Sequence, residues 1–203
     1  HTNDRRQRQM CIRDSTMSDV RSFYNRGLLT SDMVPIAEEY MPKSDLNIKT
    51  HYSEHSDGSW PSGTYYGDGS GGTNSEYPLI RRCGSAVTKM SDDGLVLLQA
   101  AYAPVPGETQ TVPRAELWAL IILLMQIDHG ADISFVTDHL NLSKSYPQGF
   151  QHCKNSINAD LYLKIFKLVR QKNVNLRIRW MPSHKFEDDI LPPGVSVSDV
   201  RSN

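Results

Sequence analysis

Residues 112–125, VPRAELWALIILLM, form the stretch that decides how the rest of the sequence is interpreted. Pro113 suits the first turn of a helix, because its φ is fixed near the helical value and the N–H that it lacks would have no partner there. The apolar residues behind it recur at the spacing of one helical face: Leu117, Leu120, Ile121 and Leu124. The stretch therefore predicts a long helix packed on a core, with Glu116 in its first turn.

Three predicted strands precede this helix, at residues 64–66, 79–89 and 95–102. The second and third are separated by SDDG at residues 91–94, and Asp-Gly is a hairpin signal because it tolerates positive φ. The three strands are therefore expected to form an antiparallel meander.

Strands and helices alternate after the helix. Residues 133–137 are a compact apolar strand that ends at Asp138, and residues 140–146 begin a short helix. Residues 158–172 predict a second long helix, and residues 174–180 alternate as a strand. The order β-β-β-α-β-α-α-β predicts an α/β fold, a mixed five-stranded sheet flanked by helices.

The first part of the chain lacks such periodicity. Residues 1–60 are polar, and residues 51–63 are rich in Ser, Gly and His, which is typical of a linker. A short helix at residues 31–39 is limited by Pro35. We therefore expect a largely disordered or linker segment over residues 1–60 and a folded domain over residues 61–203.

Composition argues against several classes of protein. The net charge of −1 gives no overall basic field, so a nucleic-acid partner would contact local patches. Cys11, Cys83 and Cys153 are too scattered for a zinc site or a disulfide framework, and they fit a reducing compartment. The apolar run at residues 117–125 is too short to span a membrane, and residues 1–15 lack the apolar core of a secretory signal. We expect an intracellular monomer, cytoplasmic or nuclear, without membrane contact.

Three acids stand at the ends of predicted elements, where side chains from different elements converge: Asp68, Glu116 and Asp138. Taken one at a time, they also fit a turn residue, a partner of the helix dipole and a helix N-cap. Clustered carboxylates stay ionised together only if cations neutralise them, and a few hard oxygen ligands suit Mg²⁺ or Mn²⁺. The acids therefore predict a site for a pair of such ions, which would activate a water and stabilise the leaving oxygen of a phosphodiester.

The motifs around these acids resemble the ribonuclease H type 1 family over residues 64–203: YGDGS at 66–70, RAELWAL at 114–120 and VTD at 136–138. WMPSH at residues 180–184 is similar to the family's catalytic-histidine loop. The resemblance implies a ribonuclease H-like fold and a metal-dependent endonuclease that hydrolyses the RNA strand of an RNA–DNA hybrid, leaving a 3′-hydroxyl and a 5′-phosphate. It also implies that Asp68, Glu116 and Asp138 hold the metal ions.

The resemblance further implies roles for residues beside the acids. His184 would lie on a mobile loop and assist the attacking water or the departure of product, with His139 as the rival candidate. Gly69, Ser70 and Arg114 are expected near the backbone of the hybrid. The RNA strand would be distinguished by its 2′-hydroxyls, which backbone and short polar groups can read in the wide minor groove.

The sequence departs from the family pattern before the second acid and at its end. Val112 and Pro113 stand where members often carry Asn, which calls one substrate contact into question. Asn203 resembles the Asn that precedes the family's fourth acid, so the domain is expected to be incomplete at its C-terminal end, with Asp199 as the alternative fourth acid. Two other functions stay open: a ribonuclease H fragment of a retroelement reverse transcriptase polyprotein, and a catalytically inactive module that binds hybrid or RNA.

Overall fold

The computed structural model describes residues 46–53, 57–72, 74, 81–183, 185–186 and 189–202, which all belong to the compact unit Ser44–Asn203. Three expectations concern residues outside these ranges: the short helix at 31–39, the role of His184 and the place of Asn203. Within the described ranges, no helix is long and apolar enough to cross a membrane.

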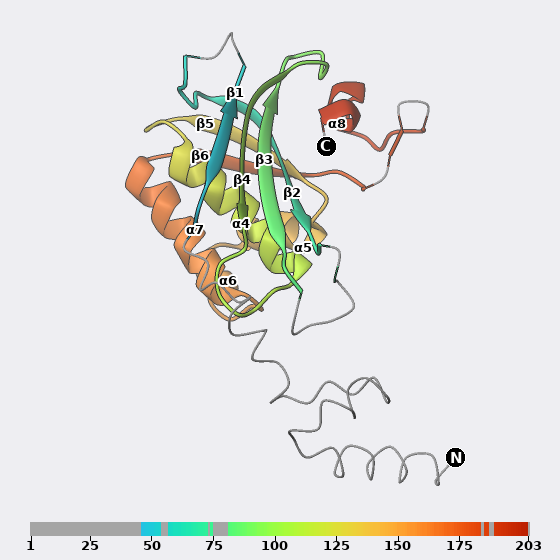
Figure 1. The fold of residues 1–203 in the computed structure, drawn as a ribbon. Helices are drawn as coiled ribbons and strands as arrows, with labels where there is room; N and C mark the ends of the chain where they lie inside the picture. Colours follow the sequence, from blue (N-terminus) through green and yellow to red (C-terminus); the bar gives the residue numbers. More distant parts are fainter. Residues whose placement is uncertain are drawn as a thin grey trace, which may run out of the picture. The chain divides into compact units, whose positions relative to one another are not determined.

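Six strands of the described part of the chain form one mixed sheet, in the spatial order β1-β4-β3-β2-β5-β6 (Figure 1). They are β1 (Lys49–Tyr52), β2 (Gly63–Ser70), β3 (Gly84–Met90), β4 (Leu97–Pro104), β5 (Asp132–Thr137) and β6 (Asn175–Trp180). The pairs β1–β4, β4–β3 and β3–β2 are antiparallel, whereas β5 is parallel to both β2 and β6. The predicted meander and the predicted α/β fold are confirmed.

The predicted number of five strands is wrong, because β1 adds a sixth strand to the described sheet. Lys49 pairs with Tyr102 and Tyr52 with Gln99, so β1 extends the sheet beyond β4. All four β1 residues are exposed, and therefore no alternation of apolar and polar residues marks this strand in the sequence. Backbone pairing with β4 decides its conformation, in a stretch whose second half was interpreted as linker.

Strand β2 is longer than predicted. It continues to Ser70, which pairs with Gly84 of β3, whereas the sequence analysis ended the strand at Tyr66. The glycines of GDGS resemble a turn, and this led to the shorter prediction. Asp68 therefore lies inside a strand and not in a turn behind it.

The helices of the described residues are α4 (Val112–Gln126), α5 (Leu140–Ser145), α6 (Phe150–Cys153), α7 (Ala159–Lys172) and α8 (Val197–Ser202), with a short 3-10 helix, η2 (Tyr146–Gln148), between α5 and α6. The predicted helices α4, α5 and α7 are confirmed, while α6 and α8 were not predicted. Successive residues of β2 point to opposite faces of the sheet. Tyr65 belongs to the main core with α4 and α7, whereas Tyr66 contacts α8, so α8 lies on the other face.

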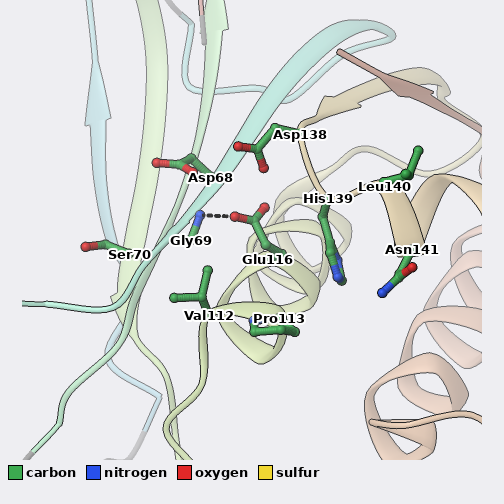
Figure 2. A pocket seen from close by; sticks show the side chains of 10 residues that line it. All are labelled: Asp68, Gly69, Ser70, Val112, Pro113, Glu116, Asp138, His139, Leu140 and Asn141. Carbon is green, nitrogen blue, oxygen red and sulfur yellow. Dashed lines mark hydrogen bonds between the residues drawn. The ribbon is translucent and has the colours of Figure 1, made fainter. Parts of the chain in front are cut away.

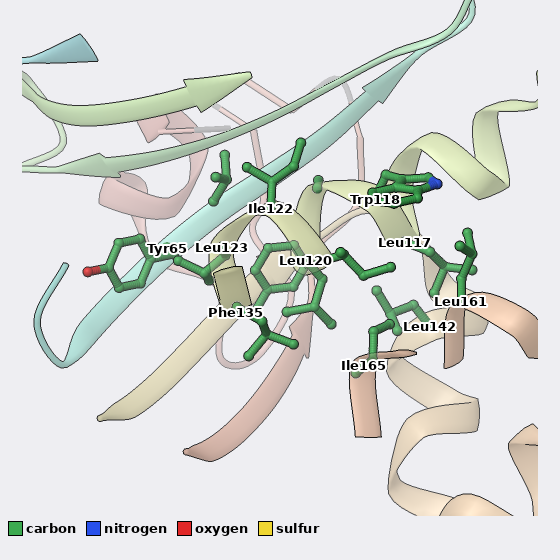
Figure 3. Packing of buried hydrophobic residues seen from close by; sticks show 14 of the residues in the cluster. Tyr65, Leu117, Trp118, Leu120, Ile122, Leu123, Phe135, Leu142, Leu161 and Ile165 are labelled. Atoms are coloured by element: carbon green, nitrogen blue, oxygen red, sulfur yellow. The ribbon is translucent and has the colours of Figure 1, made fainter. Parts of the chain in front are cut away.

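Helix α4 is buried on all sides, although its sequence predicts one buried face. Ten consecutive side chains, residues 115–124, are buried. Phe135 of β5 packs in the same cluster from the sheet, and Leu161 and Ile165 pack from α7 (Figure 3). Each large apolar side chain buried in this way contributes roughly 2 kcal/mol. The position of Glu116 relative to β2 and β5 is therefore fixed by the core.

Candidate metal centre

The side chains of three acids meet at the carboxyl ends of two neighbouring parallel strands. The register pairs Tyr66 of β2 with Val136 of β5, so Asp68 and Asp138, two residues further along each chain, lie at the same level. Glu116 reaches them from the second turn of α4, just beyond the first turn in which the sequence predicts it (Figure 2). One carboxylate oxygen of each acid lies within 4.8 Å of the others. The structure thus brings the predicted acids together.

Two glycines of β2 let α4 come close enough for this convergence. A Cβ on Gly69 would lie 2.6 Å from the backbone nitrogen of Glu116, and one on Gly67 would lie 2.2 Å from Cζ of Phe135. Neither neighbour can easily move aside, since the first is main chain and Phe135 is fully buried. Glycine is therefore needed at both positions for close approach inside the strand.

Replacing Gly69 with alanine is expected to push α4 away from β2. Overpacking of this kind costs about 1–3 kcal/mol of unfolding free energy. The shift would also break the hydrogen bond from the Gly69 N–H to Glu116, so binding of a divalent cation by the acids should weaken even where the variant is folded. Urea unfolding and Mn²⁺ titration measure the two effects. Gly84→Ala is the matched control, because a Cβ there meets nothing within 4 Å, and equal losses in both variants would contradict the prediction.

Glu116 is buried, and its two oxygens are held by different strands. Oε1 accepts a hydrogen bond of 2.8 Å from the backbone N–H of Gly69, and Oε2 accepts one of 3.2 Å from the hydroxyl of Thr137. Burial, together with the carboxylates of Asp138 and Asp68, raises the pKa of Glu116 to about 8, although both hydrogen bonds oppose the shift. Three carboxylates this close are not all ionised at neutral pH unless a positive charge joins them. The donor set therefore fits a cation.

The acids open into a cleft of about 480 Å³ (Figure 2). Its lining comes from β2 and from the beginnings of α4 and α5: Asp68, Gly69, Ser70, Val112, Pro113, Glu116, Asp138, His139, Leu140 and Asn141. Asp68 is exposed and Asp138 is half-buried, so a ligand that lies across the surface can reach both carboxylates. Gly69 and Ser70, two of the residues expected to contact substrate, are part of this lining.

His139 lines the cleft, but its imidazole points away from the carboxylates of Asp68 and Asp138 (Figure 2). Burial lowers the pKa of His139, which favours the neutral ring. Its buried Nδ1 has no hydrogen-bond partner among the described residues. His139 is thus not turned toward the acids, and His184, the first candidate for an assisting histidine, lies outside the described residues.

Arg114, the third residue expected to contact substrate, faces α7 and does not line the cleft. Its guanidinium forms a bidentate ion pair with Asp160, with Nη2 2.7 Å from Oδ2, and it donates to Oδ1 of Asn158 at 3.1 Å. Arg114 therefore joins the beginning of α4 to the beginning of α7. No local sequence pattern predicts this ion pair, because the two charged residues are 46 residues apart in the sequence.

Asp199 lies on α8 and is not part of the acid cluster found among the described residues. Its Oδ1 accepts hydrogen bonds from Arg179 at 2.8 Å and from the hydroxyl of Tyr66 at 3.1 Å, and its Oδ2 accepts one from the N–H of Ser196 at 2.9 Å. Burial disfavours the charged form, but the hydrogen bonds from Arg179 and Ser196 outweigh it and lower the pKa of Asp199 to about 2. These contacts contradict the alternative that Asp199 is the fourth metal-binding acid.

Two residues of the site were not singled out in the sequence. Thr137 contacts Glu116, and the indole N–H of Trp180 donates to the backbone oxygen of Asp138 at 3.0 Å. The signal available for Thr137 was its place directly before an acid at a strand end. The contact of Trp180 depends on the pairing of β6 with β5, which its own sequence does not show.

No protein-family model matches the sequence, and no curated protein matches it. Among solved structures, the chain is similar to the ribonuclease H domain of PFV, prototype foamy virus, at 15% identity and a TM-score of 0.50, over 70% of this chain and 87% of that domain. It is also similar to the native protease–reverse transcriptase of prototype foamy virus, at 15% identity and a TM-score of 0.48, over 76% of this chain and 21% of that one. A third match is the N-terminal ribonuclease H domain of a Mycobacterium tuberculosis protein, at 16% identity and a TM-score of 0.41, over 60% of this chain and 84% of that one.

The similarity to the viral domain agrees with the strand order and the helices described above. The sheet contains the ribonuclease H order β4-β3-β2-β5-β6, with β1 added beside β4. The chain therefore has the ribonuclease H fold, with a cluster of acids that could hold a metal ion. At this level of identity the similarity shows the fold, and the activity has to be argued from the site.

Proposed function

We propose that this protein is a metal-dependent endonuclease that hydrolyses the RNA strand of RNA–DNA hybrids. The observation that carries the proposal is the convergence of Asp68, Glu116 and Asp138 at the carboxyl ends of β2 and β5. The ribonuclease H fold supports it, because the acids lie on the elements where the sequence motifs of that family place them.

The acids suit Mg²⁺ or Mn²⁺, which prefer hard oxygen ligands and keep several waters. The metal, which we propose to be a pair of ions, would be held by Asp68, Glu116 and Asp138. When bound, the ions would supply positive charge for the developing charge of the phosphodiester and a more acidic water. The raised pKa of Glu116 supports this assignment, because burial and then repulsion by Asp138 and Asp68 cause it, and a bound cation would offset both.

The residues of the chain itself would orient the metal ligands and bind the hybrid. Glu116 is held by the Gly69 N–H and the Thr137 hydroxyl, so it needs little reorganisation to act as a ligand. Gly69 and Ser70 line the same cleft, and we propose that they contact the backbone of the hybrid. Short polar groups of this kind can read 2′-hydroxyls in the wide minor groove of an RNA-containing duplex. His184 remains our candidate for assisting the water or the departing product.

The test is a cleavage assay on end-labelled RNA–DNA hybrid, beside single-stranded RNA and duplex DNA, with Mg²⁺, with Mn²⁺ and with excess chelator. We expect cleavage of the RNA strand of the hybrid alone, in either metal, with 3′-hydroxyl and 5′-phosphate ends. Undiminished cleavage in chelator, or equal cleavage of single-stranded RNA, would refute the proposal. Binding of hybrid without cleavage in either metal would instead identify an inactive binding module.

A further inference from the structure

We infer that the Thr137 hydroxyl positions Glu116 for cation binding, which makes Thr137 a positioning residue of the metal centre. The inference rests on the proposed function in one respect, namely that the acid cluster binds a divalent cation. It concerns a side chain that holds no metal itself and contacts the site through one carboxylate oxygen.

The hydrogen bonds of Thr137 fix the direction of its hydroxyl. Its side chain is fully buried, and Oγ1 lies 3.2 Å from Oε2 of Glu116 and 3.1 Å from the backbone nitrogen of His139. The N–H of His139 can only donate, so it occupies a lone pair of Oγ1. The single hydroxyl hydrogen is then left for Glu116, and Thr137 acts as its donor.

The main chain around Thr137 is anchored independently of its side chain. The N–H of Met181 donates to the carbonyl oxygen of Thr137 at 3.0 Å, and Thr137 is paired with Trp180 in the parallel register of β5 and β6. Burial and β-branching restrict χ1 of Thr137 further. The hydroxyl is thus presented to Glu116 from a fixed frame.

This frame determines the orientation of the Glu116 carboxylate. Gly69 of β2 donates to one oxygen and Thr137 of β5 donates to the other. Asp68 lies in β2, and Asp138 directly follows β5. The plane of the carboxylate is therefore set relative to both other acids. Among the described residues each oxygen accepts one hydrogen bond of normal length, and it keeps a lone pair for a cation. Without the Thr137 donor, Oε2 would lose its partner in a buried place.

The alternative is that Thr137 only fills the core and accepts the bond from His139. Two substitutions separate the roles. Thr137→Val keeps the shape of the side chain and removes the hydroxyl, while Thr137→Ser keeps the hydroxyl and removes a methyl group. A positioning role predicts that metal affinity follows the hydroxyl, whereas a packing role predicts that stability follows the methyl group.

The experiment is a titration of the full, metal-free chain with Mn²⁺, in which electron paramagnetic resonance measures free Mn²⁺ in the absence of nucleic acid. We expect Thr137→Val to weaken Mn²⁺ binding by about 10–100-fold, the usual effect of removing a group that orients a metal ligand. Thr137→Ser should bind as the unaltered chain does. Thr88→Val on β3 is the matched control and should also leave the affinity unchanged. Circular dichroism verifies that each variant is folded.

Equal Mn²⁺ affinity in Thr137→Val and the unaltered chain would overturn the inference and leave the proposed function intact. An equally large loss in Thr137→Ser would overturn it as well. If Thr137→Val does not fold, Thr137→Ala against Thr137→Ser asks the same question, since the two differ by the hydroxyl alone. Absence of Mn²⁺ binding to the unaltered chain would overturn the proposed function together with the inference.

Discussion

Replacing either Asp68 or Asp138 with asparagine is expected to reduce hybrid cleavage by roughly a thousand-fold, which corresponds to about 4 kcal/mol of lost transition-state stabilisation. Each substitution removes one of the three carboxylates that converge at the ends of β2 and β5. An amide is neutral and a poorer ligand for a hard cation, so the metal is held less firmly. Cleavage of labelled hybrid under single-turnover conditions measures the effect.

Thermal unfolding should show that the same two variants lose activity without losing stability. Without metal they should melt at or above the temperature of the unaltered chain, because the substitution relieves the repulsion that, in addition to burial, raises the pKa of Glu116. Mg²⁺ should stabilise the unaltered chain, by about 2.7 kcal/mol at a hundred times its dissociation constant, and should stabilise the variants much less. Asp128→Asn, at the far end of α4, is the matched control. Retention of full Mg²⁺-dependent cleavage by Asp68→Asn would show that the metal centre is assigned wrongly.

Replacing Asp199 with asparagine is expected to lower the free energy of unfolding by about 3 kcal/mol, without loss of metal binding. Asp199 is 3% exposed, and the substitution removes the negative charge to which Arg179 and the N–H of Ser196 donate hydrogen bonds. It also weakens the contact with Tyr66, which fastens α8 to β2. Urea unfolding measures the loss, and Mn²⁺ titration at a temperature where the variant is folded measures the metal site.

The contribution of Asp199 to the free energy of unfolding should decrease as the pH falls. Its pKa is lowered in the folded chain to about 2 from an ordinary 3.8, so the folded state binds fewer protons than the unfolded state between these values. The contribution is about 2 kcal/mol above pH 4 and is lost as the pH falls toward 2. Asp199→Asn should lack this part of the acid dependence.

Asp160→Asn is the matched control for Asp199→Asn. It breaks the other Arg–Asp pair described here, but the carboxylate of Asp160 is 60% exposed, so the cost should stay below about 1 kcal/mol. If Asp199→Asn left stability unchanged and eliminated Mn²⁺ binding, Asp199 would be a metal ligand after all.

Much of the fold and of the acid site could be predicted because the signals are local. Periodicity over residues 112–125 and over residues 158–172 gives α4 and α7, and the Asp-Gly turn gives the hairpin of β3 and β4. The order of Asp68, Glu116 and Asp138 along these elements already implied that they would converge. In each case the residues that carry the information are neighbours in the chain.

The tertiary structure decided what depends on a partner elsewhere in the chain. Strand β1 exists through its pairing with β4, Gly67 and Gly69 are required by Phe135 and α4, and Arg114 is turned to α7 by Asp160. Asp199 was the alternative fourth acid in the sequence, yet Arg179 and Tyr66 hold it on α8, outside the acid cluster of the described residues. A side chain's type and spacing determine which element it belongs to and which chemistry it offers. The free energy of its contacts with residues tens of positions away determines where it points, and these contacts exist only after the sheet has formed.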